Sequence, residues 1–132
     1  MKKNKVFLGG TCNGSTWRDE LIPMLEIDYF NPVVPNWTQE DQKKEIKERT
    51  ESDFCLYTIT PKMSGVYSIA EVVDDSNKRP KSTIFVFLIS DEDKAFTIDQ
   101  YKSILAVEKL LIRNGVVCFD KLDDVAKWLN NQ

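Results

Sequence analysis

The chain has 132 residues, of which 42% are hydrophobic and 30% charged, and its net charge at pH 7 is −3. This length provides one hydrophobic core, so we expect a single domain over residues 1–132, and the small net charge gives no footprint for a nucleic acid polymer or an anionic membrane. The absence of histidine excludes Ser-His and Cys-His nucleophiles and most zinc sites, so carboxylates must carry any acid–base chemistry.

Short apolar runs alternate with segments of helical period, an alternation typical of a parallel sheet covered by helices. In chain order we predict strands at 5–8, 27–30, 54–59, 83–89 and 115–119. The helices that follow these strands are predicted at 15–25, 38–51, 66–74, from Thr97 or Asp99 to Asn114, and at 122–129. Pro23 should bend or shorten the first helix, and Thr38 should cap the second. The elements predict an α/β fold, a flavodoxin-like or Rossmann-like three-layer sandwich with a five-stranded parallel sheet.

The cysteines and the surface charges refine this picture. Cys55 and Cys118 lie inside apolar runs and Cys12 in a loop, with no C-x-x-C pair, which favours free thiols in buried strands and a reducing environment. The apolar stretch near the amino terminus is too short for a signal sequence or a membrane span, so we expect a cytoplasmic protein. The helix at 38–51 is polar except at Ile46, which indicates a solvated outer layer or a partner surface. The basic cluster Lys78, Arg79 and Lys81 indicates a solvated loop.

Ligands of open α/β sheets bind at the carboxyl ends of the strands, which selects the segments 9–18, 31–37 and 60–71. The glycine-rich turn after the first strand is either a plain tight turn or an anion cradle made of backbone N–H groups. Trp17 and Arg18 have two interpretations. In one, Trp17 is a core residue and Arg18 a solvated charge; in the other, both contact a ligand. Trp37 is either a stacking platform for a flat ligand or a plug at the sheet edge.

Glu71 is the candidate residue of the third segment. Val66, Ile69, Ala70 and Val73 share one helix face, which predicts that this face packs on the core and leaves Glu71 among apolar neighbours. Its side chain either reaches water at the edge of this face or points into a pocket formed by the three loops.

Three groups of residues, in this order and spacing, resemble the nucleoside 2-deoxyribosyltransferase family and the related nucleotide N-glycosidases. They are Val6-Phe7-Leu8-Gly9-Gly10-Thr11 followed by Gly14-Ser15-x-Trp17-Arg18, then Phe30-Asn31-Pro32 with Pro35-x-Trp37, then Ser52-Asp53, Pro61, Ser64-Gly65 and Ala70-Glu71. The resemblance covers about the first two thirds of the chain. It implies that Glu71 is a nucleophile that attacks C1′ of a nucleoside or nucleotide and forms a glycosyl ester, which a second base or water resolves.

The same resemblance implies an enzyme without cofactor or metal, and a homo-oligomer, at least a dimer, in which a neighbouring subunit completes each site. We expect the interface on the helix at 66–73 and on the long helix after Thr97. The resemblance and the strand-end segments together predict a set of substrate-binding residues. They are Gly9, Gly10, Thr11, Asn13, Ser15, Trp17, Arg18, Asn31, Trp37, Glu45, Asp53, Ser64 and Gly65.

The chain departs from the family in one respect. The family places an aspartate a few residues before its nucleophile, and Ser64-Gly65-Val66 stand in that region here. Three residues are therefore candidates for the proton donor to the leaving base: Glu45, Glu48 and Asp53. Asp53 is also suited to a structural cap. The alternative function is a non-catalytic nucleotide-binding module that uses the same pocket to sense a ligand.

Overall fold

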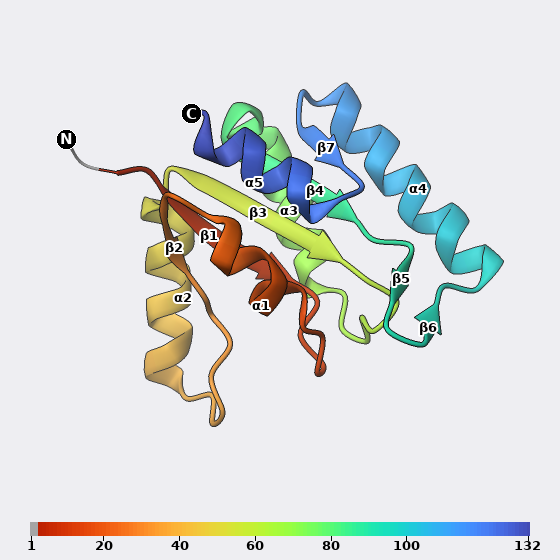
Figure 1. Cartoon of the computed structure of the whole chain (residues 1–132), viewed down its shortest axis with the longest axis horizontal. Helices are drawn as coiled ribbons and strands as arrows, with labels where there is room; N and C mark the ends of the chain where they lie inside the picture. Colours follow the sequence, from red (N-terminus) through yellow and green to blue (C-terminus); the bar gives the residue numbers. More distant parts are fainter. Residues whose placement is uncertain (1–2) are drawn as a thin grey trace.

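The computed structural model of the protein describes residues 3–132 and contains the predicted five-stranded parallel sheet. Its strand order is β2-β1-β3-β4-β7, the flavodoxin-like order, with the direction of strand progression reversed between β1 and β3 (Figure 1). The strands are β1 Lys5–Gly10, β2 Asp28–Phe30, β3 Phe54–Ile59, β4 Thr83–Phe87 and β7 Val117–Phe119.

The helices follow the predicted order, with shifted ends. They are α1 Trp17–Leu21, α2 Gln39–Glu51, α3 Tyr67–Lys78, α4 Ile98–Arg113 and α5 Leu122–Asn130, with short 3-10 helices η1 Ile22–Met24 and η2 Pro80–Ser82. Thr38 and Thr97 form capping boxes with Asp41 and Gln100, which confirms both as N-caps. As predicted, Pro23 ends α1 early, in η1, because its ring removes a backbone donor.

Some element boundaries were wrong. α3 continues four residues beyond residue 74, β4 ends at Phe87 rather than 89, and β7 begins at Val117 rather than 115. The sequence also did not predict the hairpin of β5 Ser90–Asp91 and β6 Lys94–Ala95, because two-residue strands are too short to show a period.

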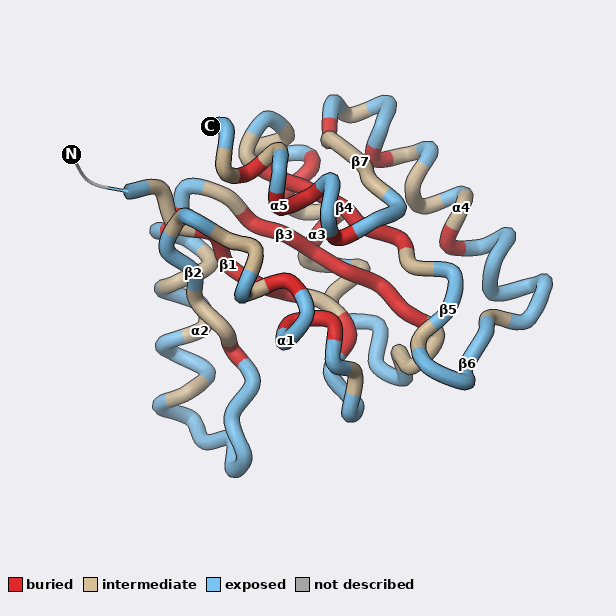
Figure 2. Tube along the Cα trace, in the orientation of Figure 1, coloured by how far each residue is buried: buried red, intermediate tan, exposed pale blue. Residues whose placement is uncertain are grey.

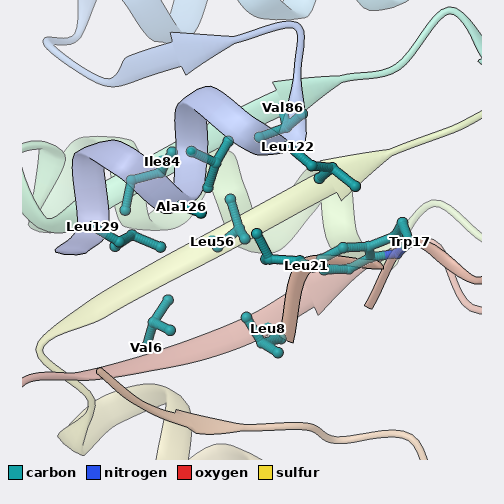
Figure 3. Close-up of a cluster of buried hydrophobic side chains, with 11 residues drawn as sticks. Val6, Leu8, Trp17, Leu21, Leu56, Ile84, Val86, Leu122, Ala126 and Leu129 are labelled. Atoms are coloured by element: carbon teal, nitrogen blue, oxygen red, sulfur yellow. The ribbon is translucent and has the colours of Figure 1, made fainter. Parts of the chain in front are cut away.

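The sheet separates two hydrophobic layers. On one face, α1 and α5 pack on Val6, Leu8, Leu56, Ile84 and Val86 (Figure 3). On the other face, α3 and α4 pack on the alternate residues of the same strands, among them Phe7, Tyr57 and Phe85. The central strands are buried along their length, whereas α2, beside β1 and β2, has no buried residue (Figure 2).

The expected packing face of α3 was only partly right. Val72, Asp75 and Ser76 are its buried residues, while Val66 is 71% exposed. Ile69 and Val73 are partly buried against the core, and together with Ala70 they also line an open groove of about 780 Å³ between α3 and α4. The apolar pattern misled because Asp75, a charged residue, faces the core, where side-chain partners satisfy its carboxylate.

The basic cluster around Pro80 is only partly solvated. Arg79 donates to the carbonyl oxygens of Arg49, Thr50 and Ser52, and so binds the orphan acceptors at the carboxyl end of α2. Cys55 is buried in β3 and Cys118 half-buried in β7, and burial raises the pKa of each thiol to about 12. Across residues 3–132, none of the helices combines the length and the hydrophobicity needed to cross a bilayer.

Candidate active site

The glycine-rich loop after β1 forms the first wall of the site. Gly10 has a φ of 118°, and a Cβ atom here would collide with the Thr58 backbone. Glycine therefore allows β1 to end close against β3, where the Thr11 N–H donates to the Thr58 carbonyl at 2.9 Å. Gly9 and Gly10 also line the main cavity, so the tight turn forms part of the cavity wall.

Trp17 and Arg18 hold this loop through hydrogen bonds to its backbone carbonyl oxygens. Trp17 is 2% exposed and donates to the Thr11 carbonyl, so it is a core residue and does not face a ligand. Arg18 is 4% exposed and donates to the carbonyls of Leu8 and Thr11 at 3.0 and 2.7 Å, with its guanidinium 4.3 Å from the Trp17 ring centroid. Burial lowers the pKa of Arg18, opposed in part by Cys12 and Glu45. Arg18 is thus no solvated charge; it positions the loop and contributes to the cavity wall.

A cavity of about 510 Å³ lies at the carboxyl end of β1, the strand at which the strand order reverses. The loops after β1 and β2 form two of its walls, and α2 and α3 form the others. The lining residues are Phe7, Gly9, Gly10, Cys12, Arg18, Pro32, Trp37, Gln42, Glu45, Ile46, Arg49, Tyr67, Ser68 and Glu71.

Of α2, the sequence predicts only Glu45 as a substrate-binding residue, and the rest of this helix as a solvated layer or partner surface; the presence of Gln42, Ile46 and Arg49 in the cavity wall is a finding of the structure. Gln42, Glu45, Ile46 and Arg49 follow the spacing i, i+3, i+4 and i+7, so they share one face, and this face lines the cavity. The spacing is visible in the sequence. It was missed because three of the four residues are polar, and a search for apolar periodicity passes over a polar face.

Glu71 lies on α3 with its carboxylate at the cavity, near Gly9 and Gly10, as expected of a residue that points into the pocket. Its side chain is 17% exposed. Burial raises the pKa of the Glu71 carboxyl to about 7, with Arg49 lowering it and Glu45 and Asp75 raising it further. The Arg49 Nε atom is 3.6 Å from Glu71 Oε2.

Only one of the three candidate proton donors reaches the cavity. Glu45 lines it and accepts a hydrogen bond from Trp37 Nε1 at 3.2 Å. Glu48 pairs with Lys5 Nζ at 2.6 Å. Asp53 accepts from the Lys5 backbone N–H at 2.8 Å, at the amino end of the strands and opposite the cavity. The prediction that Asp53 binds substrate was wrong, because a residue that precedes a parallel strand lies at the amino ends of the strands, whereas the cavity lies at their carboxyl ends.

Several predicted residues lie beside the cavity rather than in it. Thr11, Asn13, Ser64 and Gly65 line a side cavity of about 150 Å³ that shares Gly10, Cys12, Tyr67 and Ser68 with the main one. The Asn13 amide donates to Ser64 Oγ at 2.7 Å and so ties the first loop to the third.

Ser15 and Asn31 are not in the main cavity wall. Ser15 Oγ donates to Asp91 Oδ2 at 2.5 Å, and Asn31 Oδ1 accepts from the Val33 backbone. Both stabilise loop conformations next to the site. Within residues 3–132, no group of three or more His, Cys, Asp or Glu residues is arranged to hold a metal ion.

Two comparisons with known proteins complete the description. A search of curated proteins finds no match. The family model described as nucleoside 2-deoxyribosyltransferase like matches residues 3–86, more than half of the chain. The matched stretch holds β1 to β3, α1 to α3 and β4 except its last residue, and with them every residue that lines the cavity. The chain therefore belongs to the nucleoside 2-deoxyribosyltransferase-like family.

Proposed function

We propose that the protein cleaves or transfers the N-glycosidic bond of a nucleoside or nucleotide through a covalent glycosyl ester on Glu71, without metal or cofactor. The observation that carries this proposal is the pair of carboxylates, Glu71 of α3 and Glu45 of α2, that line one cavity in a chain of this family. The cavity volume of about 510 Å³ is also suited to a nucleoside, since small-molecule sites typically span about 300 to 1,000 Å³.

In the first step, an oxygen of the ionised Glu71 attacks C1′ and forms the C1′–O bond while the C1′–N bond to the base breaks. The bonding electron pair leaves with the base nitrogen, and a proton from Glu45 neutralises the departing base. Trp37, 54% exposed and hydrogen-bonded to Glu45, offers a flat surface on which this base can stack.

In the second step, water or the nitrogen of another base attacks C1′ of the ester. The new bond forms as the C1′–O bond to Glu71 breaks, and Glu45, now a carboxylate, accepts the proton that the incoming nucleophile loses. Two displacements at one carbon retain the configuration at C1′. With water the outcome is hydrolysis, and with a base it is transfer.

The experiment that tests this proposal is a panel of nucleosides and nucleoside 5′-monophosphates, with and without an added acceptor base, in which released base is followed by chromatography. Glu71→Gln should lower the rate by roughly 10³-fold or more, because the amide keeps the shape but is a far poorer nucleophile. Glu48→Gln removes a carboxylate from the same region, outside the cavity, and should retain activity. Turnover by Glu71→Gln within about tenfold of the wild-type rate would assign the chemistry to another residue.

The departure from the family pattern supports a second candidate, a nucleotide-binding module without turnover. Ser64 and Gly65, in the region where the family has its aspartate, lie in the side cavity and supply no carboxylate. Such a module would bind a member of the same panel in calorimetry and release no base on prolonged incubation.

A further inference from the structure

Arg49 connects Glu71 to a group of polar side chains beneath the cavity. Its Nε atom donates to the Tyr57 hydroxyl at 2.9 Å and lies 3.6 Å from Glu71 Oε2. Its Nη2 atom donates to Asp75 Oδ1 at 3.0 Å and to Asp74 Oδ2 at 3.1 Å. One guanidinium from α2 is therefore shared among three carboxylates of α3.

A buried pair fixes this guanidinium from the side of the sheet. Tyr57 is fully buried in β3 and donates to Asp75 Oδ2 at 2.6 Å, and Asp75 is itself only 4% exposed. Burial raises the pKa of Tyr57 far above its ordinary value, so the hydroxyl keeps the proton that it donates to Asp75. Burial lowers the pKa of Arg49, but Tyr57 and Asp75 outweigh this and raise it, so the guanidinium stays charged. Neither Tyr57 nor Asp75 lines the cavity. Both hold Arg49, and Asp75 also acts on Glu71 directly as a neighbouring negative charge.

The charges around Glu71 show why a fixed cation matters there. Among residues 3–132, Arg49 is the single cation in ion-pair contact with its carboxylate. The other titratable groups around it are Glu45 from α2, Asp74 and Asp75 from α3, and Tyr57 from β3. Arg18 and Cys12 also line the cavity. Burial and the neighbouring carboxylates favour the neutral form of Glu71, and Arg49 opposes both.

We propose that Arg49 is a positioning residue that keeps the Glu71 carboxylate ionised and directed into the cavity, and that the Tyr57–Asp75 pair holds Arg49 in place. A neutral carboxyl group does not attack C1′, so this rests on the proposed role of Glu71 as nucleophile. The effect of Arg49 on the titration of Glu71 is nevertheless measurable without any reaction.

The test is a carbon-13 NMR titration of the glutamate carboxyl groups in the full-length protein, with the Glu71 signal assigned by its loss in Glu71→Gln. Arg49→Gln should raise the midpoint of Glu71 by about one pH unit, the effect expected of an opposite charge at this distance, and Arg49→Lys should restore at least half of the shift. Lys78→Gln is the matched control. It removes a cation that pairs with Asp74 on the same helix but makes no contact with Glu71, so the midpoint should not move.

Tyr57→Phe provides a second variant, which keeps both charges and deletes only the hydroxyl that tethers Arg49. It should raise the Glu71 midpoint by less than Arg49→Gln does. An unchanged or lower midpoint would overturn the tethering role of Tyr57. This variant also decides the proposal if Arg49→Gln shows no cooperative thermal unfolding.

Activity supplies the independent readout. The acid limb of the kcat/KM profile for base release should move upward by the same number of pH units as the NMR midpoint in each variant. An unshifted midpoint in folded Arg49→Gln overturns the inference, even if Glu71-dependent base release establishes the proposed function. A shifted midpoint without base release from any substrate supports the action of Arg49 on Glu71 and overturns the proposed function alone.

Discussion

Replacing Glu71 by glutamine should stabilise the fold, and the gain should depend on pH. In the folded protein the pKa of this carboxyl is raised from 4.5 to about 7, first by burial. Folding therefore favours the protonated form. The contribution of Glu71 to stability is fully present below about pH 4.5 and is lost as the pH rises through about 7. Glutamine resembles the protonated acid and has no charge to bury, so the variant escapes this loss.

The magnitude follows from the size of the shift. Each unit of pKa difference corresponds to about 1.4 kcal/mol, so a rise from 4.5 to about 7 amounts to roughly 3 kcal/mol for a carboxylate shielded from water. Water in the open cavity screens the charge, which reduces the expected gain to about 1 to 2 kcal/mol. For a domain of 132 residues this corresponds to a rise in Tm of about 5 °C. Arg49 remains paired with Asp74 and Asp75 in the variant, so no guanidinium is left alone.

The assay is thermal unfolding of wild type and variant at about pH 5 and about pH 8, either side of the folded pKa. The difference in Tm should be small at the lower pH and should grow toward the higher one. Glu48→Gln makes the same chemical change at a carboxylate that pairs with Lys5 outside the cavity, and it should bring no gain at either pH. A Glu71→Gln variant that is less stable than wild type at about pH 8, or a difference independent of pH, would refute the reasoning.

Three further predictions concern the site and the assembly. Glu45→Gln should lower the rate of base release by about 10²-fold. The loss should be smallest for substrates whose base leaves readily, because these need less help from a proton donor; equal losses for all bases would contradict this role. Trp37→Leu should raise KM several-fold with kcat nearly unchanged, since the stacking surface is lost before the chemistry begins; a loss confined to kcat would argue against a base platform. The protein should sediment as a dimer or larger species at micromolar concentration, and Val66→Glu, at a residue 71% exposed, should shift it toward monomer if α3 and α4 form the interface; a clean wild-type monomer with full activity would exclude this assembly.

The sequence by itself determined the type and order of the main elements. The apolar runs of β1, β3 and β4 are buried on both faces, and such strands read as continuous hydrophobic segments. The sequence indicated Thr38 as the start of α2 and Thr97 as one of two candidate starts of α4, because capping is local chemistry decided within four residues. The rule that parallel strands present their carboxyl ends together placed Glu71 near that end of the sheet, and in the structure Glu71 lines the cavity there.

Tertiary structure decided which polar residues meet. Arg49, Tyr57 and Asp75 come from three different elements, and no spacing along the chain links them. Trp17 and Arg18 follow one another yet divide between core and cavity wall, because the approach of α1 to β1 sets where each side chain ends. Hydrophobic burial is repeated over many residues and leaves a period in the sequence, whereas a hydrogen bond or ion pair between distant residues depends on one relative placement of elements. The fold could therefore be predicted from the pattern, and the environment of Glu71 could not.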